Sequence, residues 1–302
     1  MVNTIEESQQ ENLFHYDLKR LQSVMSEIIQ QNISCDTWQW LEAQVAAVNN
    51  TIQFNTAFAV VPRKAGRGII KISDYQHTQL QSLRKNLYVK HWTIDRLCRV
   101  RLLMHIDASD ENHYVQAIEN LFLAAEMTEL VALYSSLPLL AYPEVWRTRC
   151  IEGIRSNIGD VLQAIMCLNP YPSEQLNEQA WNQLVLKAFF TEKPVHQIVG
   201  LDERANLQLA NTLADYADER FAAGRAINPQ LWRCVAKFMD ERIFQSIKRI
   251  FNAEKAVERE AAALACYNSN YPPAKELPNS DNELNGLIET GMITWETIAE
   301  KQ

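Results

Sequence analysis

The sequence has few of the residues that interrupt helices. Its 302 residues include 8 glycines and 10 prolines, and the strict alternation of apolar and polar residues that is typical of half-buried strands is nearly absent. This scarcity excludes a β-rich fold with many tight turns. No apolar run reaches the roughly 20 residues that a membrane-spanning helix needs, so no transmembrane segment is expected.

Positive charge is also in short supply. Lysine and arginine total 29 against 37 aspartate and glutamate residues, which gives a formal net charge of −8. Because affinity for nucleic acid depends largely on neutralising phosphates, nucleic acid is not expected as a partner. The first twelve residues carry Glu6, Glu7 and Glu11 and lack the apolar run of a secretory signal. We therefore predict a cytoplasmic protein.

Signatures of metal binding and nucleophilic catalysis are missing. The cysteines form no Cys-x-x-Cys pair, and the histidines lack the spacing of a zinc helix. There is no Gly-x-Ser-x-Gly elbow, Walker loop or Gly-x-Gly-x-x-Gly motif. We therefore expect no metal and no cofactor, and we interpret all six cysteines as reduced thiols in the core. They are Cys35, Cys98, Cys150, Cys167, Cys234 and Cys266.

Apolar residues instead recur at spacings of three and four along the whole chain, as helices require. The pattern predicts an all-α fold of stacked antiparallel helices, and a helical-repeat-like array, as in an α-solenoid, is one arrangement that fits it. Ser34, Thr93 and Asp240 are expected to cap helices.

Further helix boundaries are predicted where proline, glycine or a capping residue interrupts the apolar spacing. Residues 51–72 are ambiguous, because Ile52, Phe54, Phe58 and Val60 alternate as in a strand while the spacing also fits a helix; we read a helix followed by a loop over 62–68. Ser173 is expected to cap a helix, and Asp202 to cap a long helix that ends at Gly224. We expect one helical domain over 1–270, in which residues 1–140 pack on 141–270. A loosely attached tail with two short helices would follow over 271–302.

Unusual polar residues concentrate between 155 and 233. On the helix expected after Asp202, a line of side chains from Arg204 through Asp215 to Asp218 or Glu219 can hold a small polar ligand. The same spacing is typical of a solvated face with ion pairs, and spacing alone favours that interpretation. The candidate ligand-binding residues are Asn169, Tyr171, Trp181, Asn182, Lys187, Asp202, Arg204, Asn206, Asp215 and Glu219.

Five sequence blocks in this region resemble the EboA-domain family. They lie at 168–172, 180–188, 200–206, 215–225 and 231–234, and a weaker resemblance covers 54–67. The resemblance implies a helical bacterial protein encoded beside a prenyltransferase-like membrane protein and predicted metal-dependent TIM-barrel hydrolases. It also implies a role in the handling or export of secondary-metabolite precursors. It assigns no catalytic role to any residue.

Three hypotheses follow. The first is a non-enzymatic binding or adaptor protein that holds a small aromatic or isoprenoid-like metabolite or docks onto proteins encoded in the same cluster. The second is an enzyme whose acid–base groups come from Asp202, Asp215, Asp218 and Glu219. The third is a purely structural interaction protein. Geometry separates them, since a binding site requires the polar side chains to converge on one hollow.

Overall fold

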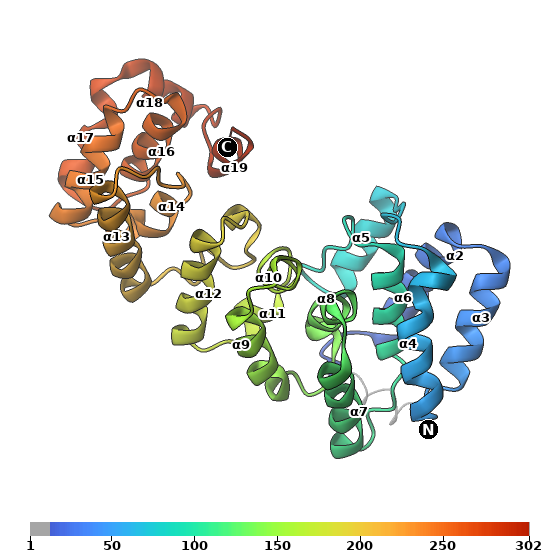
Figure 1. Ribbon diagram of the computed structural model, residues 1–302. Helices are drawn as coiled ribbons and strands as arrows, with labels where there is room; N and C mark the ends of the chain where they lie inside the picture. The colour runs from blue at the N-terminus through green and yellow to red at the C-terminus, as the bar shows by residue number, and fades with distance from the viewer. Residues whose placement is uncertain (1–12, 302) are drawn as a thin grey trace, which may run out of the picture. The chain divides into compact units, whose positions relative to one another are not determined.

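A computed structural model describes residues 13–301, which form an all-α fold (Figure 1). Within this range the contacts of strand type are limited to one isolated bridge between Ile69 and Thr93. The predicted fold class is therefore confirmed. The chain divides into two compact units; unit 1 ends at Leu176 and unit 2 begins at Asn177.

Unit 1 consists of short helices joined by short connections. Ser34 accepts a hydrogen bond from Thr37 N and so caps the second of them as predicted. The helices are α2 (Leu18–Asn32), α3 (Cys35–Ala46), α4 (Thr51–Ala65), α5 (Asp74–Leu83), α6 (Ile94–Leu103), α7 (Glu111–Ala124), α8 (Met127–Ser136), α9 (Arg147–Arg155), α10 (Gly159–Met166) and α11 (Tyr171–Gln175).

Helix α6 lies at the centre of unit 1, where it packs against α2, α3, α4 and α8 (Figure 1). Helix α6 is unusual for a core helix because several of its charged side chains are buried. Arg99 Nη1 lies 2.9 Å from Asp95 Oδ2, and the two side chains are 2% and 5% exposed. Arg101 is also buried, and its Nε donates to Ser26 Oγ at 2.9 Å. Buried charges require such partners because removing them from water is costly.

The predicted loop over 62–68 begins later than expected. Helix α4 continues through Pro62 and ends at Ala65. Proline has no N–H to donate to the carbonyl of Phe58, four residues earlier. Arg99 Nε fills this gap from α6, since it donates to Phe58 O at 2.9 Å. The helix tolerates its proline because a side chain from another helix satisfies the released carbonyl.

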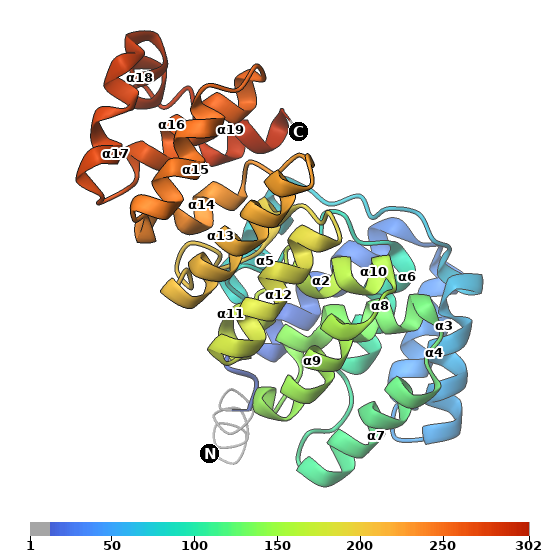
Figure 2. The ribbon, with the colours of Figure 1, turned by 60° about the vertical axis from the view of Figure 1, so that its left-hand side comes forward.

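Unit 2 is built around α16, whose small side chains let neighbouring helices approach closely. Ala261, Ala262 and Ala263 are fully buried, and α16 packs against α14, α15, α17, α18 and α19 (Figures 1 and 2). The helices of this unit are α12 (Glu178–Phe190), α13 (Leu207–Ala222), α14 (Leu231–Val235), α15 (Glu241–Phe251), α16 (Ala256–Tyr267), α17 (Pro272–Glu276), α18 (Asn282–Glu289) and α19 (Trp295–Glu300).

Residues after 271 form α17 and the two short helices predicted for the tail, α18 and α19. Ile298 of α19 is fully buried, and Gln230 Nε2 donates to Trp295 O at 2.6 Å. These contacts attach the last helix to α14. A single domain over 1–270 with a loosely attached tail stays a prediction, since its test is cooperative unfolding in solution.

Two predicted helix caps are wrong. Helix α13 begins at Leu207 and its cap is Asn206, whose Oδ1 accepts from Leu209 N at 2.8 Å. The backbone around Asp202 forms turns instead. Ser173 lies inside α11, and Asn177 caps the helix that follows. The predicted C-terminal end is confirmed, because Gly224 follows α13 with φ +65°.

The cysteines are core residues with one exception. Cys98, Cys150, Cys167, Cys234 and Cys266 are buried, whereas Cys35 is exposed. The core prediction is wrong for Cys35 because it is the first residue of α3, directly after the capping Ser34. Burial raises the pKa of the Cys98 and Cys266 thiols to about 12, which suppresses the reactive thiolate.

We therefore expect one thiol of six to react rapidly with Ellman's reagent in the native protein. The exposed Cys35 should react within minutes and the others only after denaturation, when the count should reach six. Cys35→Ser should abolish the fast phase. Two or more fast thiols in the native protein would contradict the burial of the other five.

None of the helices in residues 13–301 combines the length and apolar character needed to cross a membrane. Over the same residues, His, Cys, Asp and Glu side chains form no group of three or more that could hold a metal ion.

Candidate functional site

Asn169 and Tyr171 lie in unit 1 and join its elements. Asn169 is 5% exposed; its Nδ2 donates to Ala164 O at 2.9 Å and to Tyr134 O at 3.1 Å, and its Oδ1 accepts from Tyr171 N. The Tyr171 hydroxyl donates to Pro143 O. Burial raises the pKa of Tyr171 above its ordinary range. Both side chains use their polar atoms to hold backbone turns in place.

Asn182 and Asn206 lie in unit 2 and form a reciprocal amide pair. Asn206 Nδ2 donates to Asn182 Oδ1 at 2.8 Å, and Asn182 Nδ2 donates to Asn206 Oδ1 at 3.2 Å. Because Asn206 is also the cap of α13, the pair fixes the start of that helix against α12.

Trp181 and Arg204 form a second contact beside this pair. Trp181 is fully buried, and the Arg204 guanidinium carbon lies 4.7 Å from the centre of its ring. Burial lowers the pKa of Arg204, and the charge of Glu178 opposes that effect. Lys187 lies in the last turn of α12, where its carbonyl accepts from Thr191 N at 2.9 Å.

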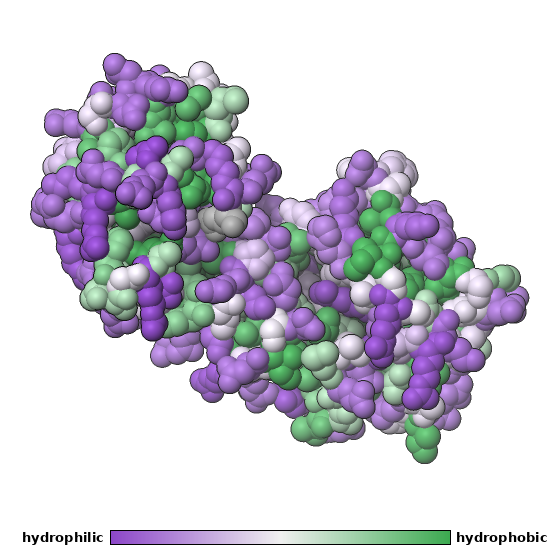
Figure 3. Space-filling view, turned by 45° about the horizontal axis from the view of Figure 1, so that its top comes forward, coloured by the Kyte–Doolittle hydropathy of each residue, from purple (hydrophilic) through white to green (hydrophobic). Residues whose placement is uncertain are grey.

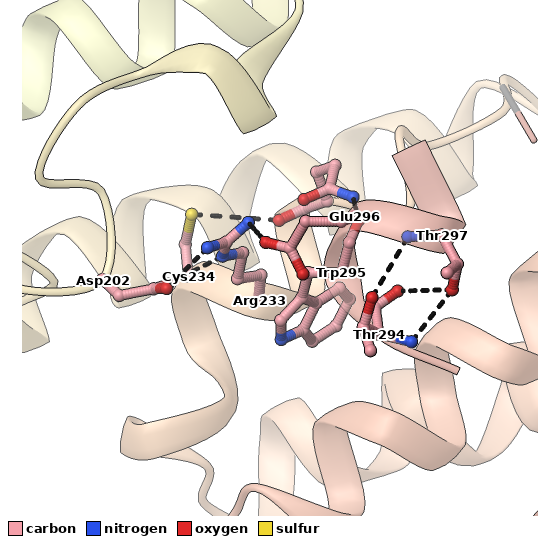
Figure 4. A network of polar contacts seen from close by, with 8 residues as sticks. Asp202, Arg233, Cys234, Thr294, Trp295, Glu296 and Thr297 are labelled. Carbon is pink, nitrogen blue, oxygen red and sulfur yellow. Dashed lines mark hydrogen bonds and ion pairs between the residues drawn. The ribbon is translucent and has the colours of Figure 1, made fainter. Parts of the chain in front are cut away.

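Asp202 takes part in a network of charged side chains (Figure 4). Its two carboxylate oxygens accept from Arg233 Nε at 2.7 Å and Nη2 at 2.6 Å, and Arg233 Nη1 lies 3.5 Å from Glu296 Oε1. Burial disfavours the charge on Arg233, but the bonds and charges of Asp202 and Glu296 outweigh it and raise its pKa. The network joins the turn at Asp202 to α14 and α19.

Asp215 contacts α15. Arg242 Nη2 binds Asp215 Oδ1 and also lies 2.7 Å from Asp218 Oδ2. The hydrogen bonds that Arg242 donates to Asp218 and to Asp215 raise its pKa. Glu219 is exposed. The predicted polar line on α13 therefore consists mainly of an exposed ion-pair network, and its role in ligand binding stays a prediction.

Arg220 is predicted from the sequence to be partly buried and bound to acids or carbonyls of a neighbouring helix. It is half-buried, and its Nε and Nη2 donate to Ala226 O at 2.9 and 2.6 Å, in the loop after its own helix. The carbonyl contact is present, but it closes the loop and does not join two helices.

We expect Arg220→Ala to lower the melting temperature more than Asp215→Ala. Hydrogen bonds to a charged group contribute roughly 1.5–3 kcal/mol, and partial exposure places Arg220 at the lower end. Exposed ion pairs contribute about 0–1 kcal/mol, and the Asp215 side chain is 64% exposed. Thermal unfolding followed by circular dichroism measures both; a larger loss for Asp215→Ala would contradict this assignment.

Apolar side chains reach the surface in small patches among hydrophilic ones on the face in Figure 3. In unit 2, a hollow of about 430 Å³ lies between the end of α13, α14 and the α15–α16 connection. Its apolar lining includes Phe221, Ile227, Trp232 and Ile250. We call this hollow the aromatic groove.

Stacked planar groups form one wall of the aromatic groove. The rings of Phe221 and Trp232 stack with centroids 6.4 Å apart and an interplanar angle of 23°. On Phe221 lies the Arg249 guanidinium, 4.3 Å from the ring centre. A second hollow of about 370 Å³ shares Phe221 and Arg249 with the groove. Arginine stacked on a ring leaves its hydrogen-bonding edge available to a ligand.

Sequence reasoning missed the aromatic groove. By its spacing Phe221 continues the apolar side of α13 that buries Leu213 and Ala217, but it is only half-buried because it lies in the last turn before Gly224. Trp232 lies in one of the blocks that carry the family resemblance, whereas Arg249 lies outside all of them. An aromatic residue in the last turn before a helix-ending glycine was the available signal.

Comparison with known proteins gives one match. The model of a family described as "Metabolite traffic protein EboA" matches residues 21–236. No curated protein and no solved structure matches the chain.

Proposed function

This chain belongs to the EboA family of metabolite traffic proteins, and from that premise we propose that it is a non-enzymatic protein that binds a small metabolite in the aromatic groove. The observation that carries the proposal is the stack of Phe221 and Trp232 beside an open hollow. Ligand pockets commonly have volumes of about 300–1,000 Å³ and apolar walls with a few polar groups. The groove falls within that description.

The proposed ligand has a flat or extended apolar body, such as a small aromatic or isoprenoid-like molecule. Stacked aromatic rings favour such bodies because they offer area and a polarised face. We propose that the protein handles a secondary-metabolite precursor in the bacterial cytoplasm, before its export or conversion by proteins encoded in the same cluster.

The contacts of the carboxylates favour binding over acid–base catalysis. Both carboxylate oxygens of Asp202 accept hydrogen bonds from Arg233, and Asp215 and Asp218 share Arg242. A general base must reach the proton that it removes, and carboxylates committed to arginines serve that role poorly. The same contacts support a structural role for these three residues.

The test is a titration of the full-length protein with N-phenyl-1-naphthylamine, a neutral apolar fluorophore. We expect saturable binding of one molecule per chain. Phe221→Ala should weaken binding by about tenfold, which corresponds to about 1.4 kcal/mol. The matched control is Phe190→Ala, because Phe190 is 58% exposed on α12 and contacts Tyr216 instead of the groove.

Absence of saturable binding would overturn the proposal, as would equal weakening by the two phenylalanine substitutions. Native mass spectrometry of the freshly purified protein provides a second measurement. A retained small molecule that is displaced by the fluorophore would support the same site.

A further inference from the structure

Resting on this proposed function, we propose that the aromatic groove selects organic anions that carry a single negative charge on a flat apolar body. A carboxylate or sulfonate attached to an aromatic ring system represents the class. Three features of the groove lead to this specificity: an available arginine edge, a small excess of positive charge, and an apolar floor.

Arg249 provides the first feature. It lines the aromatic groove and the second hollow described above, and the face of its guanidinium lies on Phe221. With the carboxylates of residues 13–301 it forms no ion pair. Stacking restrains the side chain, and its edge presents N–H donors in the geometry that a carboxylate accepts. A ligand anion would therefore meet donors that are already oriented.

The charges around the groove provide the second feature. Three cations, Arg225, Arg249 and Lys255, line the hollow together with two carboxylates, Glu254 and Glu258. Lys255 Nζ lies 3.6 Å from Glu258 Oε1, so one of the cations is already partly neutralised. Three positive charges less two negative ones leave one positive charge. One ligand charge balances the site, whereas a second would meet the repulsion of the glutamates.

The floor of the groove provides the third feature. Trp232 is 2% exposed, Ile250 is 5% exposed, and Ile227 is 8% exposed. The two isoleucines offer no hydrogen bonds, and Trp232 has a single indole N–H donor, so the floor cannot replace the hydration of a small inorganic ion. They suit the body of an organic acid, whose charged end can remain at the rim beside Arg249 and Arg225.

The experiment compares 2-naphthoate with 2-naphthamide, which share a ring system and differ in charge, by calorimetric titration of the full-length protein. We expect 2-naphthoate to bind at least about tenfold more tightly in low salt and to lose this advantage as salt is added. A third ligand, 2-naphthyl phosphate, carries a larger charge at pH 8 and should bind no more tightly than 2-naphthoate.

Variants identify the responsible side chain. The measured quantity is the affinity for 2-naphthoate divided by the affinity for 2-naphthamide. Arg249→Gln should reduce this ratio to about one third or less of its value in the native protein. Arg225→Gln should reduce it as well. Lys248→Gln is the control, because it removes the same charge one residue away, where Lys248 lies 4.9 Å from the Phe244 ring. It should leave the ratio unchanged.

Equal affinities for the acid and the amide in the native protein would overturn the anion proposal, as would the same ratio in the Arg249 and Lys248 variants. Binding of N-phenyl-1-naphthylamine at Phe221 would still stand in both cases. Tighter binding of the phosphate than of the carboxylate would overturn the single-charge specificity. If no neutral ligand binds at Phe221, the proposed function itself fails.

Discussion

Arg99→Ala is expected to lower the free energy of unfolding by roughly 3–5 kcal/mol, the range for breaking a buried charge pair. The side chain makes three kinds of contact within unit 1. It pairs with Asp95, it lies 3.9 Å from Glu129 Oε1, and it donates to Phe58 O. Removing it leaves a buried carboxylate without its partner and a buried carbonyl without a donor. Urea unfolding followed by circular dichroism measures the loss.

The control for this substitution is Lys90→Ala. Lys90 pairs with Asp74 in the same unit, but the two side chains are 41% and 95% exposed. We expect no measurable change, because water solvates both charges when the pair is broken. Similar losses for Arg99→Ala and Lys90→Ala would show that the charge at Arg99 is not buried in solution.

The contact with Phe58 O can be tested separately by a double-mutant cycle with Pro62→Ala. Alanine restores the N–H that proline lacks, and this donor can bind Phe58 O within α4. Arg99→Met should therefore cost less in the Pro62→Ala background than in the native chain. The expected coupling is about 1 kcal/mol, the typical contribution of one hydrogen bond. Additive losses would mean that Arg99 does not satisfy this carbonyl.

Gly153→Ala is expected to destabilise unit 1 by about 1–3 kcal/mol, the usual cost of overpacking a core. Gly153 lies inside α9, where glycine normally costs roughly 0.5–1 kcal/mol relative to alanine. A Cβ at this position would lie 2.3 Å from Ile165 Cδ1 and 2.6 Å from Tyr134 Cε1. The steric overlap outweighs the gain in helix propensity, so the sign of the effect reverses.

Gly286→Ala serves as the matched control, since Gly286 also lies inside a helix. A Cβ there would have no atom within 4 Å. We therefore expect this substitution to raise stability by about 0.5–1 kcal/mol. Thermal melts of both variants give the comparison. A stabilised Gly153→Ala protein would show that α8, α9 and α10 pack less closely than described.

The spacing of apolar residues predicted the fold class, because helix periodicity is local. Local signals also located Asp240 as a cap and Gly224 as a helix end. The course of α4 through Pro62 could not be predicted in this way. It depends on Arg99, which belongs to a different helix. The residues next to Pro62 in the sequence therefore give no sign of this contact.

Several polar residues in the blocks that resemble the EboA-domain family make contacts between structural elements. Asn182, Asn206 and Asp202 are candidate ligand-binding residues in the sequence because they are amides and acids near aromatic residues. In the structure they join elements to one another. Sequence alone cannot separate these roles, since a side chain that binds a ligand and one that binds a helix end have the same chemistry. The two roles differ in which partner the side chain contacts, and that partner depends on tertiary packing.

The aromatic groove is assembled from two stretches of chain, and the family model covers only the first of them. Phe221 and Trp232 lie within the segment matched by the family model, whereas Arg249 and Lys255 lie beyond its last residue. Within the cationic rim, Arg225 lies inside the matched segment, so the segment holds the stacking face and one cation of the rim. A substitution at Arg249 or Lys255 would therefore change the charge at the rim while the two stacked rings and Arg225 stay in place.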